Sequence, residues 1–284
     1  MSNHTCFTVD VSDGVAHIQM SRPDELNTMT REFWAELPEL LRTLDSSGEV
    51  RAAVLSSAPG RHFCAGMHLA NFGSGNFSAD GAKDRELAGE AIRRSALELQ
   101  EVLTTFERVR FPVLAAIQGG CVGGGVDMVT ACDMRYCTQD AWFCIQEINI
   151  GMTADVGTLQ RLPKLVAPGL VRQWAYTGER VRAEAAMQSG LVNQVFETHE
   201  AMIEGVLAIA RTIASKPPLA ILGTKVSLLY SRDHSVEDGL NFIATWNGGM
   251  LSSRDLFEGI AAQAEKREPE YENLKENKRY AERS

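Results

Sequence analysis

Residues 119–133 read "GGCVGGGVDMVTACD", with three successive glycines and an acidic residue two positions after them. It follows "FPVLAAI" (residues 111–117), a continuous apolar run typical of a strand buried on both faces, and a helical pattern begins near Gly124. The glycines are therefore predicted to form a strand-to-helix turn. The first turn of a helix has unpaired N–H donors, and glycine lets a ligand approach them closely. Taken alone, the segment is equally well explained as a tight turn packed against a neighbour, and it matches neither a P-loop nor G-x-G-x-x-G.

The sequence before and after this turn alternates between strand and helix patterns. Apolar and polar residues alternate in "VAHIQM", which predicts a half-buried strand, and apolar residues on one face predict a helix over residues 30–44, with Pro38 inside it. Further strands are predicted at "FTVDV" and "RAAVLSS", and a further helix over residues 87–107. Alternation of strands and helices predicts an α/β fold.

Strand patterns stop after about residue 199. The chain therefore divides into a core, residues 1–198, and a C-terminal helical region, residues 199–284. The apolar face of "VEDGLNFIATWNGGM" (residues 236–250) needs a partner surface, which predicts an oligomer built on this region, although packing on the core of the same chain would also cover it. The charged tail, residues 266–284, is predicted to be a helix that is solvated or contacts another subunit.

The composition limits the class of protein. The chain has 284 residues, 44% of them hydrophobic, and a formal charge of −9, which describes a globular protein with a sizeable core and argues against nucleic acid as a partner. No window reaches the roughly 18 consecutive apolar residues of a membrane span, and no signal, transit or peroxisomal pattern is recognised. The six cysteines lie mostly in apolar segments without C-x-x-C spacing, which predicts buried, reduced thiols. We therefore predict a cytoplasmic protein with no membrane partner.

A second turn of small residues lies in "HFCAGMHL" (residues 62–69), again after a predicted strand. Backbone N–H groups from this turn and from the glycine-rich turn, aimed at one point, would form an oxyanion hole. Such a pair stabilises a thioester oxygen as negative charge develops on it during enolate chemistry.

Five segments, in this order and spacing, resemble the crotonase (enoyl-CoA hydratase/isomerase) superfamily: "SRPDELNTM", "FCAGMHL", "AAIQGGCVGGGVDM", "CDMRY" and "GTLQRLP". The resemblance covers nearly the whole chain. Within the superfamily the sequence is most similar to the Δ3,5-Δ2,4-dienoyl-CoA isomerases, in "DMRYCTQDAWF", "ADVGTLQRLPK" and "LLYSRDHSVED". The resemblance implies a spiral of ββα units, a C-terminal helical region that makes trimers, often paired into hexamers, and an acyl-CoA substrate. Because CoA is part of that substrate, no separate cofactor and no metal are expected.

The resemblance also assigns the backbone groups of the site. The N–H groups of Met67 and Gly124 would form the oxyanion hole. CoA would be held by Gly124 and by the backbone of the turn within residues 62–69, at Ala65, Gly66, Met67, His68 and Leu69. His68 stands where many relatives carry Asp, and it is assigned no chemical role.

Three carboxylates, Asp127, Glu147 and Asp155, match the catalytic positions of the family. Each of them alone would be read as a helix cap or a solvated loop residue, and Asp155 before "VGTL" is a candidate cap. In an apolar pocket and near one another, carboxyl groups have raised pKa values, so that one can act as a base while another carries a proton.

The third carboxylate separates two activities of the family. Hydratases typically have Pro-Gly in place of Ala154 and Asp155, whereas the dienoyl isomerases have Asp, Glu and Asp, as this sequence does. The resemblance therefore implies an isomerase that shifts the double bonds of a 3,5-dienoyl-CoA to the 2,4-positions. Glu147 and Asp155 would transfer the proton, and Asp127 would be a secondary electrostatic or hydrogen-bonding partner. A 2-enoyl-CoA hydratase is the main alternative.

Two weaker alternatives come from the same superfamily. An aryl-CoA dehalogenase would use Asp155 as its nucleophile, but that relative has Trp at the position of Glu147. An RNA-binding homologue would need a basic helix, and the long predicted helix offers only Arg93 and Arg94 among acidic neighbours.

Overall fold

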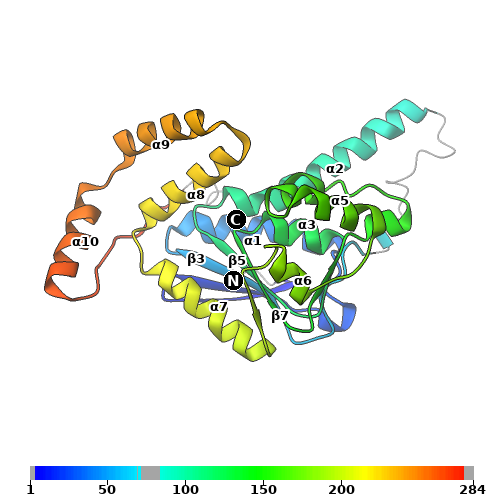
Figure 1. The fold of residues 1–284 in the computed structure, drawn as a ribbon, viewed down its shortest axis with the longest axis horizontal. Helices are drawn as coiled ribbons and strands as arrows, with labels where there is room; N and C mark the ends of the chain where they lie inside the picture. The colour runs from blue at the N-terminus through cyan, green and yellow to red at the C-terminus, as the bar shows by residue number, and fades with distance from the viewer. Residues whose placement is uncertain (1–3, 69, 72–83, 278–284) are drawn as a thin grey trace.

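The computed structural model describes residues 4–68, 70–71 and 84–277, and within them two sheets form the centre of the fold (Figure 1). The larger sheet has the strand order β1-β2-β3-β5-β7-β10, in which β1 and β2 form an antiparallel hairpin and the other neighbours are parallel. Its strands are β1 (Phe7–Ser12), β2 (Val15–Met20), β3 (Ala52–Ser57), β5 (Val113–Ile117), β7 (Met134–Thr138) and β10 (Gln194–Phe196).

The smaller sheet has the order β4-β6-β8-β9, with β4, β6 and β8 parallel and β9 antiparallel to β8. Its strands are β4 (His62–Cys64), β6 (Gly120–Val122), β8 (Trp142–Cys144) and β9 (Val181–Arg182). Along the chain β3 leads to β4, β5 to β6 and β7 to β8, so each turn of the chain adds one strand to each sheet. This arrangement confirms the predicted α/β spiral of ββα units.

Helices connect many of the strands, and in the described part of the chain four further α-helices come after the last strand. The α-helices are α1 (Arg31–Ser47), α2 (Arg85–Arg108), α3 (Gly124–Ala131), α4 (Thr158–Arg161), α5 (Pro168–Thr177), α6 (Ala183–Gln188), α7 (His199–Ala214), α8 (Pro218–Asp233), α9 (Val236–Met250) and α10 (Ser253–Glu265). The described 3-10 helices include η1 (Pro23–Glu25), η3 (Glu147–Ile150) and η4 (Leu162–Lys164). Thr30, predicted as the first residue of a helix, is the N-cap of α1, and α1 continues through Pro38.

The hydrophobic core lies on both faces of the larger sheet. One face packs against α7 through side chains such as Val54, Leu114 and Val206. The opposite face is covered by α1, α2, α3 and the smaller sheet, with Phe33, Phe106 and other buried residues between them. The six cysteines are free and buried, as predicted. The predicted domain boundary at residue 198 stays a prediction, and α7, which follows it, packs on the large sheet.

The C-terminal helices α8, α9 and α10 extend to one side of the sheets (Figure 1). The described part of the tail, residues 266–277, contains no helix, so the prediction of a helical tail is wrong there. This segment returns to the core. Arg51 donates to the carbonyl of Tyr271 at 2.6 Å, Arg110 donates to that of Lys275 at 2.9 Å, and the N–H of Asn277 donates to the carbonyl of Ser46 at 2.8 Å.

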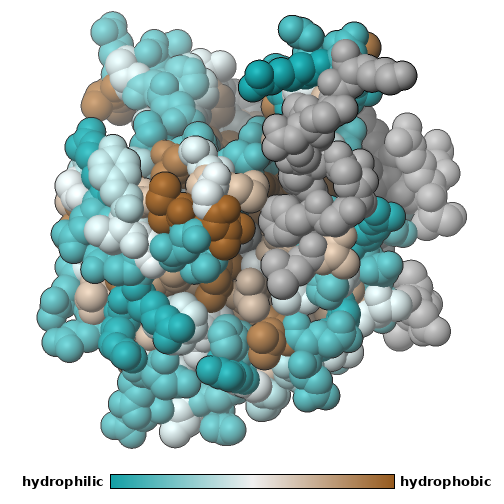
Figure 2. All heavy atoms as spheres, turned by 90° about the vertical axis from the view of Figure 1, so that its right-hand side faces the viewer, coloured by the Kyte–Doolittle hydropathy of each residue, from teal (hydrophilic) through white to brown (hydrophobic). Residues whose placement is uncertain are grey.

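No single described helix is long and apolar enough to cross a membrane, and α7 with α8 meets the requirement only as a pair bent by 107°. Seen from the end of the molecule that holds α2 and α5, hydrophobic side chains gather at one place within a mostly hydrophilic surface (Figure 2).

Candidate active site

The three predicted carboxylates line one pocket. The pocket has a volume of about 790 Å³, and its wall includes Asp127 of α3, Glu147 of η3 and Asp155 of the loop before α4. The predicted backbone residues of the site line it too, namely Ala65, Gly66, Met67, His68 and Gly124. Leu69 lies outside the described residues. Positions up to ninety residues apart in the sequence therefore meet at one cavity.

The two small-residue turns meet backbone against backbone. A Cβ atom on Gly66 would lie 2.8 Å from the carbonyl oxygen of Val122 and 3.4 Å from the nitrogen of Gly124, and Gly66 has a φ of +84°. Because L side chains rarely adopt that conformation and no side chain fits there, the position requires glycine. The requirement brings Met67, the next residue, beside the start of α3.

The N–H of Met67 points away from its neighbouring strand. The N–H of Met29 donates to the carbonyl of Gly66 at 2.9 Å, and the carbonyl of Met29 accepts from the N–H of His68 at 3.1 Å. Met67 lies between Gly66 and His68 in this parallel bridge, so its own N–H and carbonyl face away from Met29. No acceptor for this N–H is found among residues 4–68, 70–71 and 84–277. The N–H of Gly124 belongs to the first turn of α3, where no preceding helical carbonyl is available. Both groups are thus available as donors in the pocket wall.

Glu147 is the least satisfied of the three carboxylates. Its Oε2 is buried and, within the described part of the chain, has no hydrogen-bond partner. Its Oε1 lies 3.1 Å from the point where a Cβ on Gly123 would stand, and Gly123 has a φ of +53°. Burial, and secondarily the charge of Asp127, raise the pKa of Glu147 to about 7. A glutamate with this pKa can carry or release a proton near neutral pH.

Asp127 is almost fully buried, with 1% of its surface exposed. One of its oxygens, Oδ1, accepts a 2.6 Å hydrogen bond from the N–H of Thr158, the first residue of α4. Burial raises the pKa of Asp127 to about 6, although the hydrogen bond from Thr158 opposes the shift. Asp127 therefore binds the start of α4 through Oδ1, and its second oxygen, Oδ2, takes no part in that bond.

Asp155 is half-buried, and its backbone is fixed from α2. Gln100 Nε2 donates to the carbonyl oxygen of Asp155 at 2.6 Å. Burial raises the pKa of the Asp155 carboxyl above its ordinary value, and a bond from its own N–H lowers it in part. Asp155 is not a helix cap, because α4 begins after Gly157 and its N-cap makes no side-chain bond. The carboxylate at the start of α4 is instead that of Asp127.

These observations give the pocket its chemical capacity. Three carboxyl groups with raised pKa values face one cavity, so a protonated and an ionised carboxyl can coexist there near neutral pH. Two backbone donors stand at the same cavity and can stabilise a developing oxyanion. Over residues 4–68, 70–71 and 84–277, no group of three or more His, Cys, Asp or Glu side chains is arranged to hold a metal ion.

One wall of the pocket, which the smaller sheet provides, was not predicted from the sequence. His62 of β4 and Trp142 of β8 lie edge to face with ring centroids 5.7 Å apart, and the guanidinium of Arg180 stands 4.1 Å from the Trp142 ring centre. Gly120 between the two strands leaves the room, since a Cβ there would lie 2.5 Å from the His62 ring. The signal in the sequence was weak, because each strand has only three residues.

Comparison with curated proteins identifies similar chains. The chain is 44% identical over 255 residues to the human protein named "Delta(3,5)-Delta(2,4)-dienoyl-CoA isomerase, mitochondrial", with 89% of this chain and 77% of that protein covered. It is 42% identical over 265 residues to the peroxisomal protein of the same name from Arabidopsis thaliana, with 93% and 95% covered.

These names contradict the predicted localisation. The similar proteins are named mitochondrial or peroxisomal, so the prediction of a cytoplasmic protein is wrong. Buried, reduced thiols and a globular composition are compatible with more than one cellular compartment, so they were not sufficient to predict a cytoplasmic localisation.

A solved structure and a family model agree on the fold. The enoyl-CoA hydratase from Bacillus anthracis superposes with a TM-score of 0.84 at 28% identity, covering 94% of this chain and 99% of that one. The family model described as "Enoyl-CoA hydratase/isomerase" matches residues 10–275. With the spiral of ββα units and the paired turns at one pocket, the chain belongs to the enoyl-CoA hydratase/isomerase family.

Proposed function

We propose that the protein is an isomerase that converts a 3,5-dienoyl-CoA into the 2,4-dienoyl-CoA. The observation that carries the proposal is the meeting of three carboxylates with two backbone donors at one pocket. The names of the similar human and Arabidopsis proteins support it. An acyl-CoA thioester is the substrate class to which an oxyanion hole is suited.

The reaction moves one proton along the acyl chain. One carboxylate of the pair Glu147 and Asp155 removes a proton from C2, and the electrons of that C–H bond spread over the diene and the thioester oxygen. The N–H groups of Met67 and Gly124 stabilise this dienolate. The other carboxyl then gives a proton to C6, which leaves double bonds at the 2- and 4-positions. The reaction is redox-neutral, so we propose that it uses no cofactor beyond the CoA of the substrate.

Asp127 has a supporting role in this proposal. Its Oδ1 binds Thr158 and its charge helps to raise the pKa of Glu147. Glu147 is therefore partly protonated near neutral pH, which suits either role in the pair, as the base at C2 or as the acid at C6.

A 2-enoyl-CoA hydratase is the second candidate, because Asp127 and Glu147 could hold a water molecule between them. The hydrogen bond from Thr158 to Asp127 and the presence of Asp155 favour the isomerase, since a hydratase needs no third carboxylate.

The two candidates are separated by incubating the purified protein with a 3,5-dienoyl-CoA and, separately, with a 2-enoyl-CoA. We expect the ultraviolet absorbance of the conjugated 2,4-dienoyl product to rise in the first reaction. Loss of 2-enoyl absorbance in the second reaction, without any 2,4-dienoyl product in the first, would favour the hydratase.

We also propose that the chain forms a homotrimer or a dimer of trimers through its C-terminal helices. A pocket of about 340 Å³ between α8, α9 and α10 is lined by apolar side chains including Trp246, Met250 and Ile260. Phe257 on α10 is 67% exposed. Exposed apolar surface of this kind is typical of subunit contacts. Light scattering at micromolar concentration tests the proposal, and a mass near that of one 31.1 kDa chain would refute it.

A further inference from the structure

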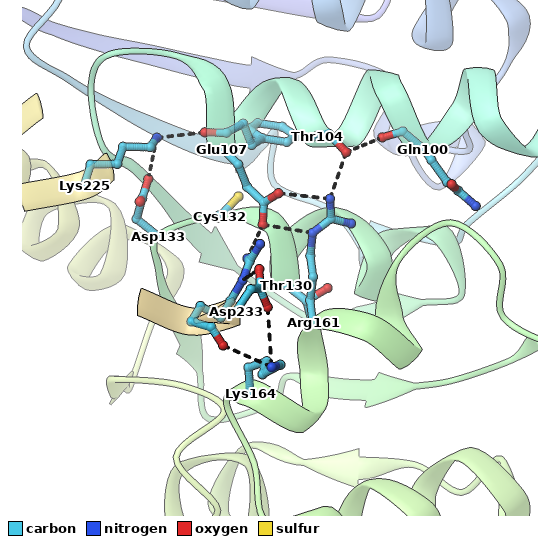
Figure 3. A network of polar contacts seen from close by, with 12 residues as sticks. Gln100, Thr104, Glu107, Thr130, Cys132, Asp133, Arg161, Lys164, Lys225 and Asp233 are labelled. Atoms are coloured by element: carbon cyan, nitrogen blue, oxygen red, sulfur yellow. Dashed lines mark hydrogen bonds and ion pairs between the residues drawn. The ribbon is translucent and has the colours of Figure 1, made fainter. Parts of the chain in front are cut away.

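Glu107, near the end of α2, joins two segments that are far apart in the sequence (Figure 3). Its carboxylate accepts two hydrogen bonds from Arg161 of α4, at 3.1 and 3.2 Å, and one from Arg232 of α8, at 2.5 Å. Arg161 lies in "ADVGTLQRLPK" and Arg232 in "LLYSRDHSVED". The two segments that most resemble the dienoyl-CoA isomerases therefore meet at one buried carboxylate.

The contact is largely shielded from solvent. The side chains of Arg161 and Glu107 are each 12% exposed, and that of Arg232 is 30% exposed. Burial alone would raise the pKa of Glu107, but the two guanidinium groups outweigh it and lower that pKa. Glu107 is thus a charged group in a protected place, and removal of one arginine leaves its charge less compensated.

Arg161 continues the connection to the catalytic loop. Its guanidinium donates to the carbonyl oxygen of Val156 at 3.4 Å and to the hydroxyl of Thr104 at 2.9 Å. A Cβ on Gly157 would overlap Arg161 Nη1, so the guanidinium lies directly against the loop. The loop carries Asp155 on one side of these contacts and Thr158, the partner of Asp127, on the other.

A second contact between the same two segments is more exposed. Lys164 donates to the carbonyl oxygen of Arg232 at 3.0 Å and pairs with Asp233 at 3.4 Å. The side chains of Lys164 and Asp233 are about half exposed, at 46% and 50%. Exposed ion pairs contribute little, so we assign the connection mainly to Glu107.

We infer that Arg232, Glu107 and Arg161 are positioning residues for the isomerisation, which fix the Asp155 loop from the C-terminal helical region. The inference rests on the proposed function, because the reaction it serves is the transfer of a proton by Asp155. None of the three residues touches the pocket, and each acts through the loop. The physical reason is that a shift of about 1 Å in a proton-transfer group costs up to a hundredfold in rate.

The test uses the full-length protein and four variants. Arg232→Met removes the guanidinium from α8, Glu107→Gln removes the shared charge with little change of shape, and the third variant combines the two. Arg232→Lys restores a cation at the same place. The isomerisation rate of a 3,5-dienoyl-CoA is measured for each protein. Hydrogen–deuterium exchange of residues 152–161 and the mass by light scattering are measured in parallel.

We expect Arg232→Met and Glu107→Gln each to lower kcat roughly tenfold with little change of KM, because binding of the thioester is untouched. Exchange at residues 152–161 should become faster in both. The double variant should lose no more than the worse single variant, since the residues act as one unit. Arg232→Lys should recover part of the lost rate.

Arg254→Met is the matched control. Arg254 also lies in the C-terminal region, but its ion pairs are with Asp255 of α10 and Glu272 of the tail. It should leave kcat and the exchange of residues 152–161 unchanged. Unchanged kcat and exchange in Arg232→Met, or losses that multiply in the double variant, would overturn the inference. If the wild-type protein shows no isomerase activity but Arg232→Met still makes residues 152–161 exchange faster, the proposed function is refuted. The structural connection from Arg232 to the loop would then still hold.

Discussion

Replacement of Glu147 by Gln should make the protein more stable at high pH while it stops the reaction. The Glu147 carboxyl has a pKa of about 7 in the folded protein against 4.5 ordinarily, so the folded state binds its proton more tightly than the unfolded state does. Below pH 4.5 the carboxyl is protonated in both the folded and the unfolded state, so its burial carries no free-energy cost from a buried charge. As pH rises from 4.5 through 7, the unfolded state gives up this proton before the folded state does, so stability is lost across this range. Above pH 7 the folded state keeps a buried carboxylate whose Oε2 has no partner among the described residues.

The magnitude follows from the difference between the two pKa values. It corresponds to about 3 kcal/mol at pH 8 and less than about 1 kcal/mol at pH 5. The amide of the Glu147→Gln variant would carry no charge at either pH, so the stability of this variant relative to wild type should rise between these values, equivalent to roughly 5–10 °C in melting temperature. An unpaired amide would cost the same at both pH values and cancels in the comparison.

The assay is thermal unfolding of both proteins at pH 5 and pH 8, with the isomerase rate measured in parallel. Glu49→Gln changes an exposed glutamate and serves as the control for the loss of one carboxylate. If Glu147→Gln differs from wild type equally at both pH values, the carboxyl has an ordinary pKa and the reasoning about its burial fails.

The remaining predictions concern the other parts of the site. Asp155→Asn should lower isomerisation by roughly 10²-fold with little loss of stability, because Asp155 caps no helix, and an unchanged rate would remove Asp155 from the mechanism. Gly124→Pro removes the backbone donor and should abolish turnover, whereas Gly124→Ala keeps the N–H and its Cβ comes close only to the sulfur of Met29. Equal activities in the two folded variants would place the oxyanion hole elsewhere. Gly157→Ala should destabilise the protein, because the new Cβ meets Arg161 and the backbone φ is +137°, and a melting temperature equal to wild type would contradict this.

The sequence predicted those parts of the fold that local patterns determine. The buried strand at residues 113–117 is a continuous apolar run, and α1 places its apolar residues on one face, so both are visible within a short window. The turn at Gly124 was predictable because three successive glycines between a strand and a helix have few structural uses. The three carboxylates were found through a resemblance, since no local pattern connects Asp127 with Asp155.

The predictions failed where distant contacts decide the structure. The residues that follow Asp155 make it a candidate N-cap of α4. The carboxylate that accepts a bond from the first residue of α4 is instead that of Asp127, which lies 31 residues before Thr158. The three-residue strands of the smaller sheet are too short for an alternating pattern to be recognised. Charge in the tail suggested a helix, whereas its carbonyl groups are held by Arg51 and Arg110.

The return of the tail to the core has a consequence for the order of folding. The bond from Arg51 to the carbonyl of Tyr271 joins residues 220 positions apart, and that from Arg110 to Lys275 joins residues 165 apart. During synthesis the sheets can assemble before residues 271–277 exist, so these two hydrogen bonds form only after the strands have been made. The tail should therefore close over an already folded core, and in native-state hydrogen exchange its amides should open before those of the larger sheet.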